Sequence, residues 1–144
     1  MATPTRPALN VLVADDHAPA RRLVALALGR HASVLEVQSG AQAIELCRAL
    51  TPALAILDLS MPGGLSGLDT CRALRQDPAT AGMAVLICTA STRPEHAQAC
   101  REAGADALLT KPFSPDALLS LVGSLVAGLG QAATAAQAGP TLDC

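Results

Sequence analysis

The sequence of 144 residues has almost no aromatic side chains, since it contains one phenylalanine, Phe113, and no tryptophan or tyrosine. Proteins that bind RNA bases or single-stranded nucleic acid stack the bases on aromatic rings. A basic charge excess is missing as well, because 10 Lys and Arg residues face 12 Asp and Glu residues, for a net charge of −2. We therefore expect neither direct nucleic-acid binding nor attraction to an anionic membrane surface.

Long apolar runs and metal-binding cysteine motifs are also absent. The most apolar stretch, residues 117–130, is shorter than the roughly 20 residues that a membrane span needs, and residues 1–10 lack the pattern of a signal peptide. The five cysteines form no Cys-x-x-Cys pair and no Cys/His cluster, which argues against a zinc site. Reduced, mostly buried thiols are typical of a reducing compartment, so the sequence predicts a cytoplasmic protein without membrane contact.

Short apolar runs alternate with segments of helical pattern along the chain. About half of the residues are hydrophobic (51%), enough for a core on two sides of a sheet. The predicted strands cover residues 9–14, 33–37, 53–57, 84–88 and 107–109. Helices are predicted at about 17–30, 39–50, 66–76, 93–103 and from 114 onward. This alternation predicts an α/β fold, a parallel sheet with right-handed crossovers and helices on both faces.

One domain accounts for this pattern. We assign it to residues 8–127, and we expect residues 1–7 to be a flexible N-terminus. Residues 128–144 consist of small and polar residues without a second apolar pattern, and we expect a flexible low-complexity tail there.

Polar residues follow four of the predicted strands. Asp15 and Asp16 follow the first strand, Asp58 the third, Thr89 the fourth and Lys111 the fifth. Turn residues are common after strands, so any one of these positions has a purely structural explanation. However, parallel strands end at one edge of the sheet, where ligands bind. The sequence therefore predicts that three carboxylates, a hydroxyl and an ammonium group converge there.

This set of groups suits phosphoryl transfer beside a hard cation. Clustered carboxylates repel one another unless a cation neutralises them, and Mg²⁺ prefers oxygen ligands. We expect Asp16 and Asp58 to be direct ligands and Asp15 to bind through water. Asp58 is the candidate nucleophile, while Lys111 and the Thr89 hydroxyl would stabilise phosphoryl oxygens.

Four stretches in this order resemble a bacterial response-regulator receiver domain of two-component systems. They are VLVADDH (11–17), AILDLSMPG (55–63), LICTAS (86–91) and GADALLTKPFSPDAL (104–118). The resemblance covers residues 8 to about 127. It implies a flavodoxin-like (βα)5 three-layer sandwich with the strand order 2-1-3-4-5.

The resemblance also implies roles for individual residues. Asp58 would accept a phosphoryl group from a sensor histidine kinase or a phosphotransfer protein, with Lys111 as the phosphate-binding lysine and Thr89 as the switch hydroxyl. Asp15, Asp16 and Asp58 would hold Mg²⁺ together with the backbone carbonyl of Ser60. Such a protein is no enzyme in the usual sense, because it catalyses only its own phosphorylation and dephosphorylation. The Lys111–Pro112 peptide bond is usually cis in this family.

Two features depart from the family pattern. Leu108 stands where the family has the aromatic residue that reads out the state of Thr89, and the loop MPGGLSG (61–67) is one residue longer than the commonest form. The output partner is unknown, because the sequence shows no effector domain. A homodimer through the fourth and fifth helices is one open option.

Two other functions compete with a phosphorylatable receiver. One is a receiver-like scaffold that binds partners without phosphorylation, and the full set of five polar groups speaks against it. The other is a metal-dependent phosphatase with an aspartyl nucleophile. Such enzymes place a second aspartate two residues after the nucleophile as general acid, where this chain has Ser60.

The remaining histidines and cysteines have structural explanations. We expect His17, His31 and His96 on the surface and Cys47, Cys71 and Cys88 in the core. Cys144 is expected to be exposed.

Overall fold

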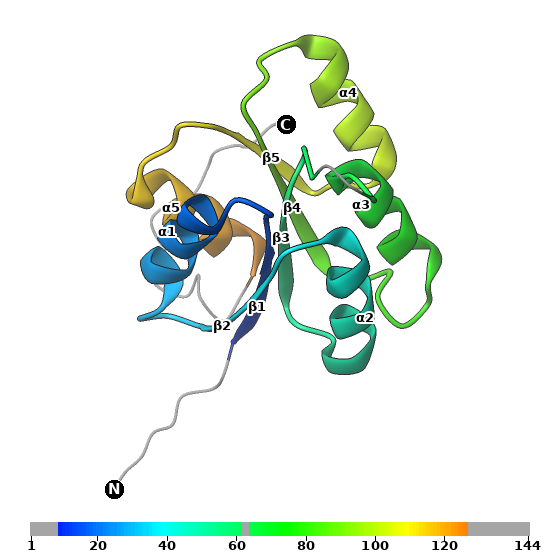
Figure 1. The fold of residues 1–144 in the computed structure, drawn as a ribbon, viewed down its shortest axis with the longest axis horizontal. Coiled ribbons are helices and arrows are strands. Elements are labelled where there is room, and N and C mark those ends of the chain that lie inside the picture. Colours follow the sequence, from blue (N-terminus) through cyan, green and yellow to red (C-terminus); the bar gives the residue numbers. More distant parts are fainter. Residues whose placement is uncertain (1–8, 62–63, 127–144) are drawn as a thin grey trace, which may run out of the picture.

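Five parallel strands form one sheet with helices on both faces in the computed structural model (Figure 1), which describes residues 9–61 and 64–126. The predictions for residues 1–7, 128–144 and Cys144, and the length of the loop around residues 62–63, lie outside the described residues. The strands are β1 (Asn10–Ala14), β2 (Ser33–Val37), β3 (Leu54–Asp58), β4 (Ala84–Thr89) and β5 (Ala107–Thr110). The helices are α1 (Ala18–Leu28), α2 (Gly40–Leu50), α3 (Gly67–Gln76), α4 (Pro94–Ala103) and α5 (Pro115–Leu125).

The sheet order is β2-β1-β3-β4-β5, and every neighbouring pair is parallel. Both the order and the flavodoxin-like architecture confirm the prediction. Helices α1 and α5 cover one face, and α2, α3 and α4 cover the other (Figure 1). The middle strand, β3, is buried along its whole length, as a strand covered on both faces must be.

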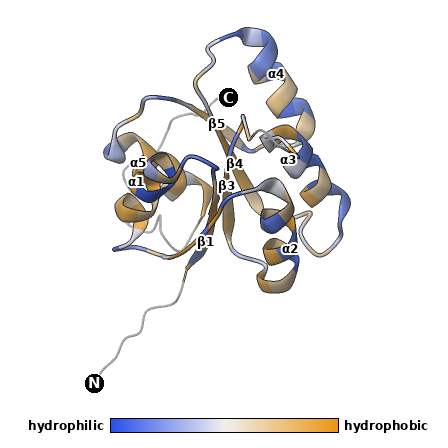
Figure 2. Cartoon of the chain, in the orientation of Figure 1, coloured by the Kyte–Doolittle hydropathy of each residue, from blue (hydrophilic) through white to orange (hydrophobic). Residues whose placement is uncertain are grey.

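Two apolar clusters fill the layers between the sheet and its helices. Along β1, Leu12 and Ala14 face α2, α3 and α4, whereas Val11 and Val13 face α1 and α5. This alternation follows from the two-residue period of a strand. Figure 2 shows hydrophobic colours along the strands and hydrophilic colours on the outward sides of α3 and α4. As predicted, Cys47, Cys71 and Cys88 are buried, and no disulfide forms among the cysteines of the described ranges.

Capping residues set the helix boundaries. Ser39, Ser66 and Ser114 each accept a hydrogen bond from a backbone N–H in the first turn of the helix that follows. The first helix ends at Leu28, two residues earlier than predicted, because the N–H groups of His31 and Ala32 both turn back to the carbonyl of Leu28. The last helix ends at Leu125, and the more distal part of the predicted apolar stripe lies outside the described residues.

Candidate functional site

The five predicted polar groups come from four adjacent strands of the sheet. Asp15 and Asp16 follow β1, Asp58 is the last residue of β3, Thr89 is the last residue of β4, and Lys111 follows β5. The order β1-β3-β4-β5 therefore brings their strand ends to one edge. Asp58 and Thr89 extend their strands by one residue beyond the predicted ends, because Asp58 pairs with Cys88 and Thr89 with Thr110.

The three aspartates form a compact acidic cluster. One carboxylate oxygen from each of Asp15, Asp16 and Asp58 lies within 4.8 Å of the others, and these are the residues in the described ranges that could jointly hold a metal ion. Asp15 and Asp58 are buried, with 6% and 9% of their surface exposed, whereas Asp16 is exposed to solvent. Three carboxylate donors with one open side match the oxygen ligands and retained water that Mg²⁺ requires.

Lys111 follows the edge strand β5 and extends its side chain into this cluster. Its ammonium nitrogen Nζ lies 2.7 Å from Oδ1 of Asp58 and 3.4 Å from Oδ2 of Asp15. The backbone N–H of Lys111 donates to the carbonyl of Thr89 at 2.8 Å, so the lysine is fixed relative to the end of β4. The Lys111–Pro112 bond is cis, as predicted.

Burial and the interaction between Asp58 and Lys111 shift the pKa of each of these two groups in opposite directions. Burial raises the pKa of Asp58 above its ordinary value, and the hydrogen bond from Lys111 only partly offsets this, while the charges of Asp15 and Asp16 raise the pKa further. Burial alone would lower the pKa of Lys111, but its hydrogen bond and charge interaction with Asp58, together with Asp15, raise it. The ammonium group therefore stays charged beside the carboxylate that is the candidate nucleophile.

Hydrogen bonds hold the loop after β1 in place. The side chain of Asp15 accepts from the N–H of His17 at 2.9 Å, and its backbone N–H donates to the carbonyl of Val37 at 3.2 Å. The guanidinium of Arg21 donates to the backbone carbonyl of Asp15 at 2.7 Å and to Glu36 at 3.0 Å. These bonds hold both the side chain and the backbone of Asp15 in place.

Arg21 was not predicted from the sequence as part of this site. It is a buried arginine with 9% of its surface exposed, and it lies on the same side of α1 as the buried residues Val24 and Leu28. The i, i+3, i+7 spacing of these three residues is the available signal, because it places a charged residue on the core-facing stripe of the helix.

Thr89 is buried, and its side-chain oxygen accepts a hydrogen bond from the N–H of Ser91 at 3.0 Å. Among the described residues, the Thr89 hydroxyl donates no hydrogen bond. Its proton is therefore available to a ligand at the end of β4.

The remaining predictions from the sequence concern the exposure of Ser60 and of the histidines. Ser60 is exposed two residues after Asp58, and no contact tests the role of its carbonyl. His17, His31 and His96 are exposed, as expected. However, His96 has a partner that the sequence did not reveal, because its Nδ1 lies 2.6 Å from the hydroxyl oxygen of Ser91.

A hollow of about 490 Å³ opens beside the acidic cluster, between α1 and the loop after β5. Its polar end is formed by Asp15, Asp58 and Lys111, and its walls include Leu23 and Phe113. Within the described ranges, no helix is long and apolar enough to cross a bilayer.

The fold and the site define a class of proteins, parallel α/β domains with an acidic cluster and a lysine at the carboxyl edge of the sheet. Comparison with known families narrows this class. The family model described as "Response regulator receiver domain" matches residues 11–123. The chain therefore belongs to the receiver domains of two-component response regulators.

Individual relatives agree with this assignment. The chain is 35% identical over 114 residues to the DNA-binding response regulator MtrA of Mycolicibacterium paratuberculosis, covering 78% of this chain and 49% of MtrA. It is 37% identical over 134 residues to the virulence sensor protein BvgS of Bordetella pertussis, covering 88% of this chain and 11% of BvgS. The chain thus spans about half the length of MtrA and a small part of BvgS.

Solved structures share the fold. The chemotaxis response regulator CheY4 of Vibrio cholerae superimposes with a TM-score of 0.78 at 26% identity, over 83% of this chain and 100% of CheY4. A response regulator signal receiver domain from Bermanella marisrubri gives a TM-score of 0.73 at 33% identity, over 83% of this chain and 98% of that domain.

Proposed function

We propose that this receiver domain accepts a phosphoryl group on Asp58 in the presence of Mg²⁺ and thereby switches its protein partners. The observation that carries the proposal is the contact of 2.7 Å between Lys111 Nζ and Asp58 Oδ1 inside a cluster of three carboxylates. A nucleophilic carboxylate, a fixed cation and a metal-binding acid pair are the groups that phosphoryl transfer needs.

In the proposed reaction, a carboxylate oxygen of Asp58 forms a bond to the phosphorus of the donor. The bond between phosphorus and the donor's imidazole nitrogen breaks, and the electron pair leaves with the imidazole of a histidine kinase or phosphotransfer protein. Lys111 moves from the Asp58 oxygen to a phosphoryl oxygen, and the Thr89 hydroxyl donates a hydrogen bond to another phosphoryl oxygen. Hydrolysis of the acyl phosphate later regenerates Asp58, so the chain catalyses only its own phosphorylation and dephosphorylation.

Asp16 and Asp58 would bind Mg²⁺ directly, Asp15 through water, and Ser60 through its backbone carbonyl. The ion would supply neutralisation of negative charge on the phosphoryl group. The donor set fits this ion because it contains only hard oxygen ligands and keeps Asp16 open to solvent.

A histidine kinase of a two-component system is the proposed phosphoryl donor, and a homodimer through α4 and α5 stays a prediction. The buried thiols of Cys47, Cys71 and Cys88, with no disulfide in the described ranges, support a reducing compartment, for which we propose the cytoplasm.

The test is incubation of the protein with acetyl phosphate and Mg²⁺, followed by intact-mass spectrometry. We expect a gain of one phosphoryl group that is stable in acid and labile in base. The gain should disappear in Asp58→Asn and persist in Asp116→Asn, a control at an exposed acid in the first turn of α5. The absence of any gain would overturn the proposal and favour a scaffold that works without phosphorylation. A gain that persists in Asp58→Asn would overturn the assignment of Asp58 as the acceptor.

A further inference from the structure

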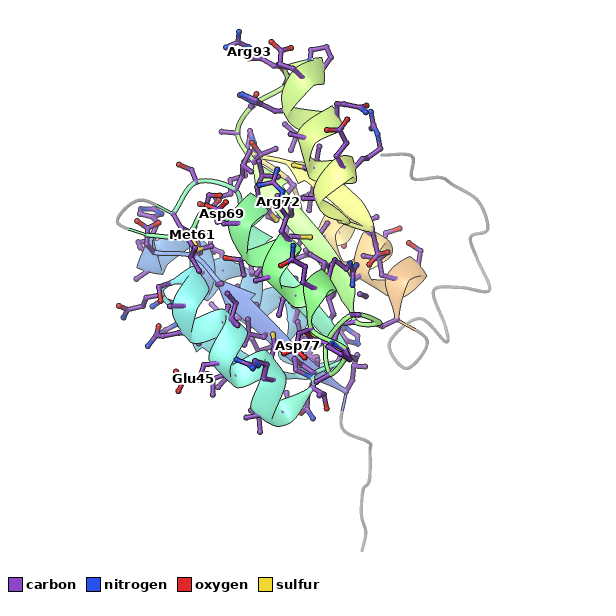
Figure 3. The ribbon with its side chains drawn as sticks, turned by 90° about the vertical axis from the view of Figure 1, so that its right-hand side faces the viewer. Glu45, Met61, Asp69, Arg72, Asp77 and Arg93 are labelled. Atoms are coloured by element: carbon purple, nitrogen blue, oxygen red, sulfur yellow. The ribbon has the colours of Figure 1, made fainter. Side chains whose placement is uncertain are left out.

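Side-chain hydrogen bonds hold the short connection between β4 and α4. The hydroxyl oxygen of Thr89 accepts from the N–H of Ser91 at 3.0 Å, and the hydroxyl oxygen of Ser91 accepts from the N–H of Arg93 at 3.1 Å. Each hydroxyl thus fixes the backbone two residues further on. Figure 3 shows Arg93 at the outer tip of this connection, where α4 begins.

His96 continues this series of contacts into α4. Its Nδ1 lies 2.6 Å from the Ser91 hydroxyl oxygen, while its backbone N–H donates to the carbonyl of Arg93 at 3.0 Å. The contacts Thr89–Ser91–His96 therefore run without a break from a buried hydroxyl at the candidate site to the first turn of the helix. We call these three residues the hydroxyl–imidazole ladder.

The first half of α4 contributes no buried residue to the core. The buried residues of this helix are Cys100 and Ala103, both in its second half, whereas residues 94–99 are exposed or half-buried. A segment with few buried apolar contacts opens or moves at a low free-energy cost. The ladder is thus well placed to set the position of this half of the helix.

The aromatic residue with which the family reads out the state of Thr89 is replaced by Leu108 in this chain. Leu108 pairs with Ile87 and packs against the apolar cluster under α2, α3 and α4, and leucine has no group that exchanges hydrogen bonds. Phe113 is the only aromatic residue of the chain, and it packs against the cluster on the opposite face. The hydrogen-bonded contacts Thr89–Ser91–His96 offer a polar connection from Thr89 to α4.

We propose that Ser91 and His96 are positioning residues that transmit the phosphorylation state of Asp58 from Thr89 to the first half of α4. This inference rests on the proposed phosphorylation of Asp58. A phosphoryl oxygen on Asp58 accepts a hydrogen bond from the Thr89 hydroxyl and draws the hydroxyl oxygen toward the end of β3. The N–H of Ser91 follows that oxygen, and the Ser91 hydroxyl carries the displacement to His96.

The experiment uses the full chain labelled with ¹⁵N and the phosphoryl mimic beryllofluoride with Mg²⁺. In the wild type, we expect the amide resonances of residues 95–99 to shift when the mimic binds. Ser91→Ala and His96→Ala should lose most of this shift, although the resonance changes around Asp58 and Lys111 remain. Ser91→Thr keeps the hydroxyl and should restore the response of α4.

Thr92→Ala is the matched control, because Thr92 is exposed and makes no hydrogen bond through its side chain in the described structure. It should leave both the shifts and the affinity for the mimic within about twofold of the wild type. Circular dichroism should verify that all variants are folded.

Two negative results are distinguishable. Binding of the mimic with a full α4 response in Ser91→Ala and His96→Ala would overturn this inference alone. Failure of the wild type to bind beryllofluoride at Asp58 would overturn the proposed function together with the inference.

Discussion

Lys111 and Asp58 form an ion pair of 2.7 Å between two segments that lie 53 residues apart in the chain. The pair joins the end of β5 to the end of β3 across the intervening strand β4. A bound Mg²⁺ ion would compete with the Lys111 ammonium group for the carboxylate of Asp58. This competition leads to the first prediction.

Lys111→Met should separate metal binding from phosphoryl transfer. Loss of the ammonium removes the stabilisation of phosphoryl oxygens, so phosphorylation by acetyl phosphate should slow by about 100-fold. Affinity for Mg²⁺ should stay equal or increase, because a positive charge leaves the site. Rates from intact-mass time courses and Mg²⁺ titration by calorimetry check the two effects, and weaker Mg²⁺ binding in Lys111→Met would contradict the assigned role.

Asp16→Asn should weaken Mg²⁺ binding by more than about 10-fold, because it removes the solvent-facing carboxylate of the cluster. Calorimetric titration measures the change, and a chelator should reverse any thermal stabilisation that Mg²⁺ gives the wild type. Glu45→Gln is the control, because it also removes one negative charge. Figure 3 shows Glu45 on α2, pointing away from the body of the protein. Equal affinity of Asp16→Asn and Glu45→Gln would exclude Asp16 as a ligand.

Arg21→Met should destabilise the fold by about 2–4 kcal/mol, because it leaves the carbonyl of Asp15 and one oxygen of Glu36 without their buried donor. Arg22→Met is a close control. Arg22 also pairs with Glu36, at 3.4 Å, but 64% of its side chain is exposed, so we expect a loss of less than about 1 kcal/mol. Urea unfolding monitored by circular dichroism gives both values. Equal losses in the two variants would show that the contact with Asp15 contributes little.

Gly67→Ala should displace the backbone of Asp58. A Cβ atom at position 67 would lie 2.5 Å from the backbone oxygen of Asp58 and 2.9 Å from Cα of Leu59, so the end of β3 or the start of α3 must shift. We expect a loss of about 1–3 kcal/mol in urea unfolding and slower phosphorylation.

Gly82→Ala provides the comparison, because no atom lies within 4 Å of a Cβ at that position. Its stability should change by less than about 0.5 kcal/mol. Unchanged stability and phosphorylation in Gly67→Ala would show that this close approach is not required.

The order of the elements and the edge at which the site lies follow from the amino-acid pattern alone. Buried parallel strands need continuous apolar runs, and right-handed crossovers leave few ways to arrange five of them. Residues that follow such strands must gather at one edge, so Asp15, Asp58 and Lys111 could be grouped before any coordinates were known. The starts of α2 and α3 were predicted within one residue, because the capping residues Ser39 and Ser66 precede them.

Which side chains are in contact depends on the folded arrangement. The distance between Lys111 and Asp58, the hold of Arg21 on Asp15 and the contact of His96 with Ser91 depend on register, helix rotation and the reach of flexible side chains. Sequence spacing specifies none of these quantities, because one pattern of residue types is compatible with many rotamers and small displacements. The residues at the strand ends thus follow from the sequence, whereas the side-chain contacts between them depend on packing.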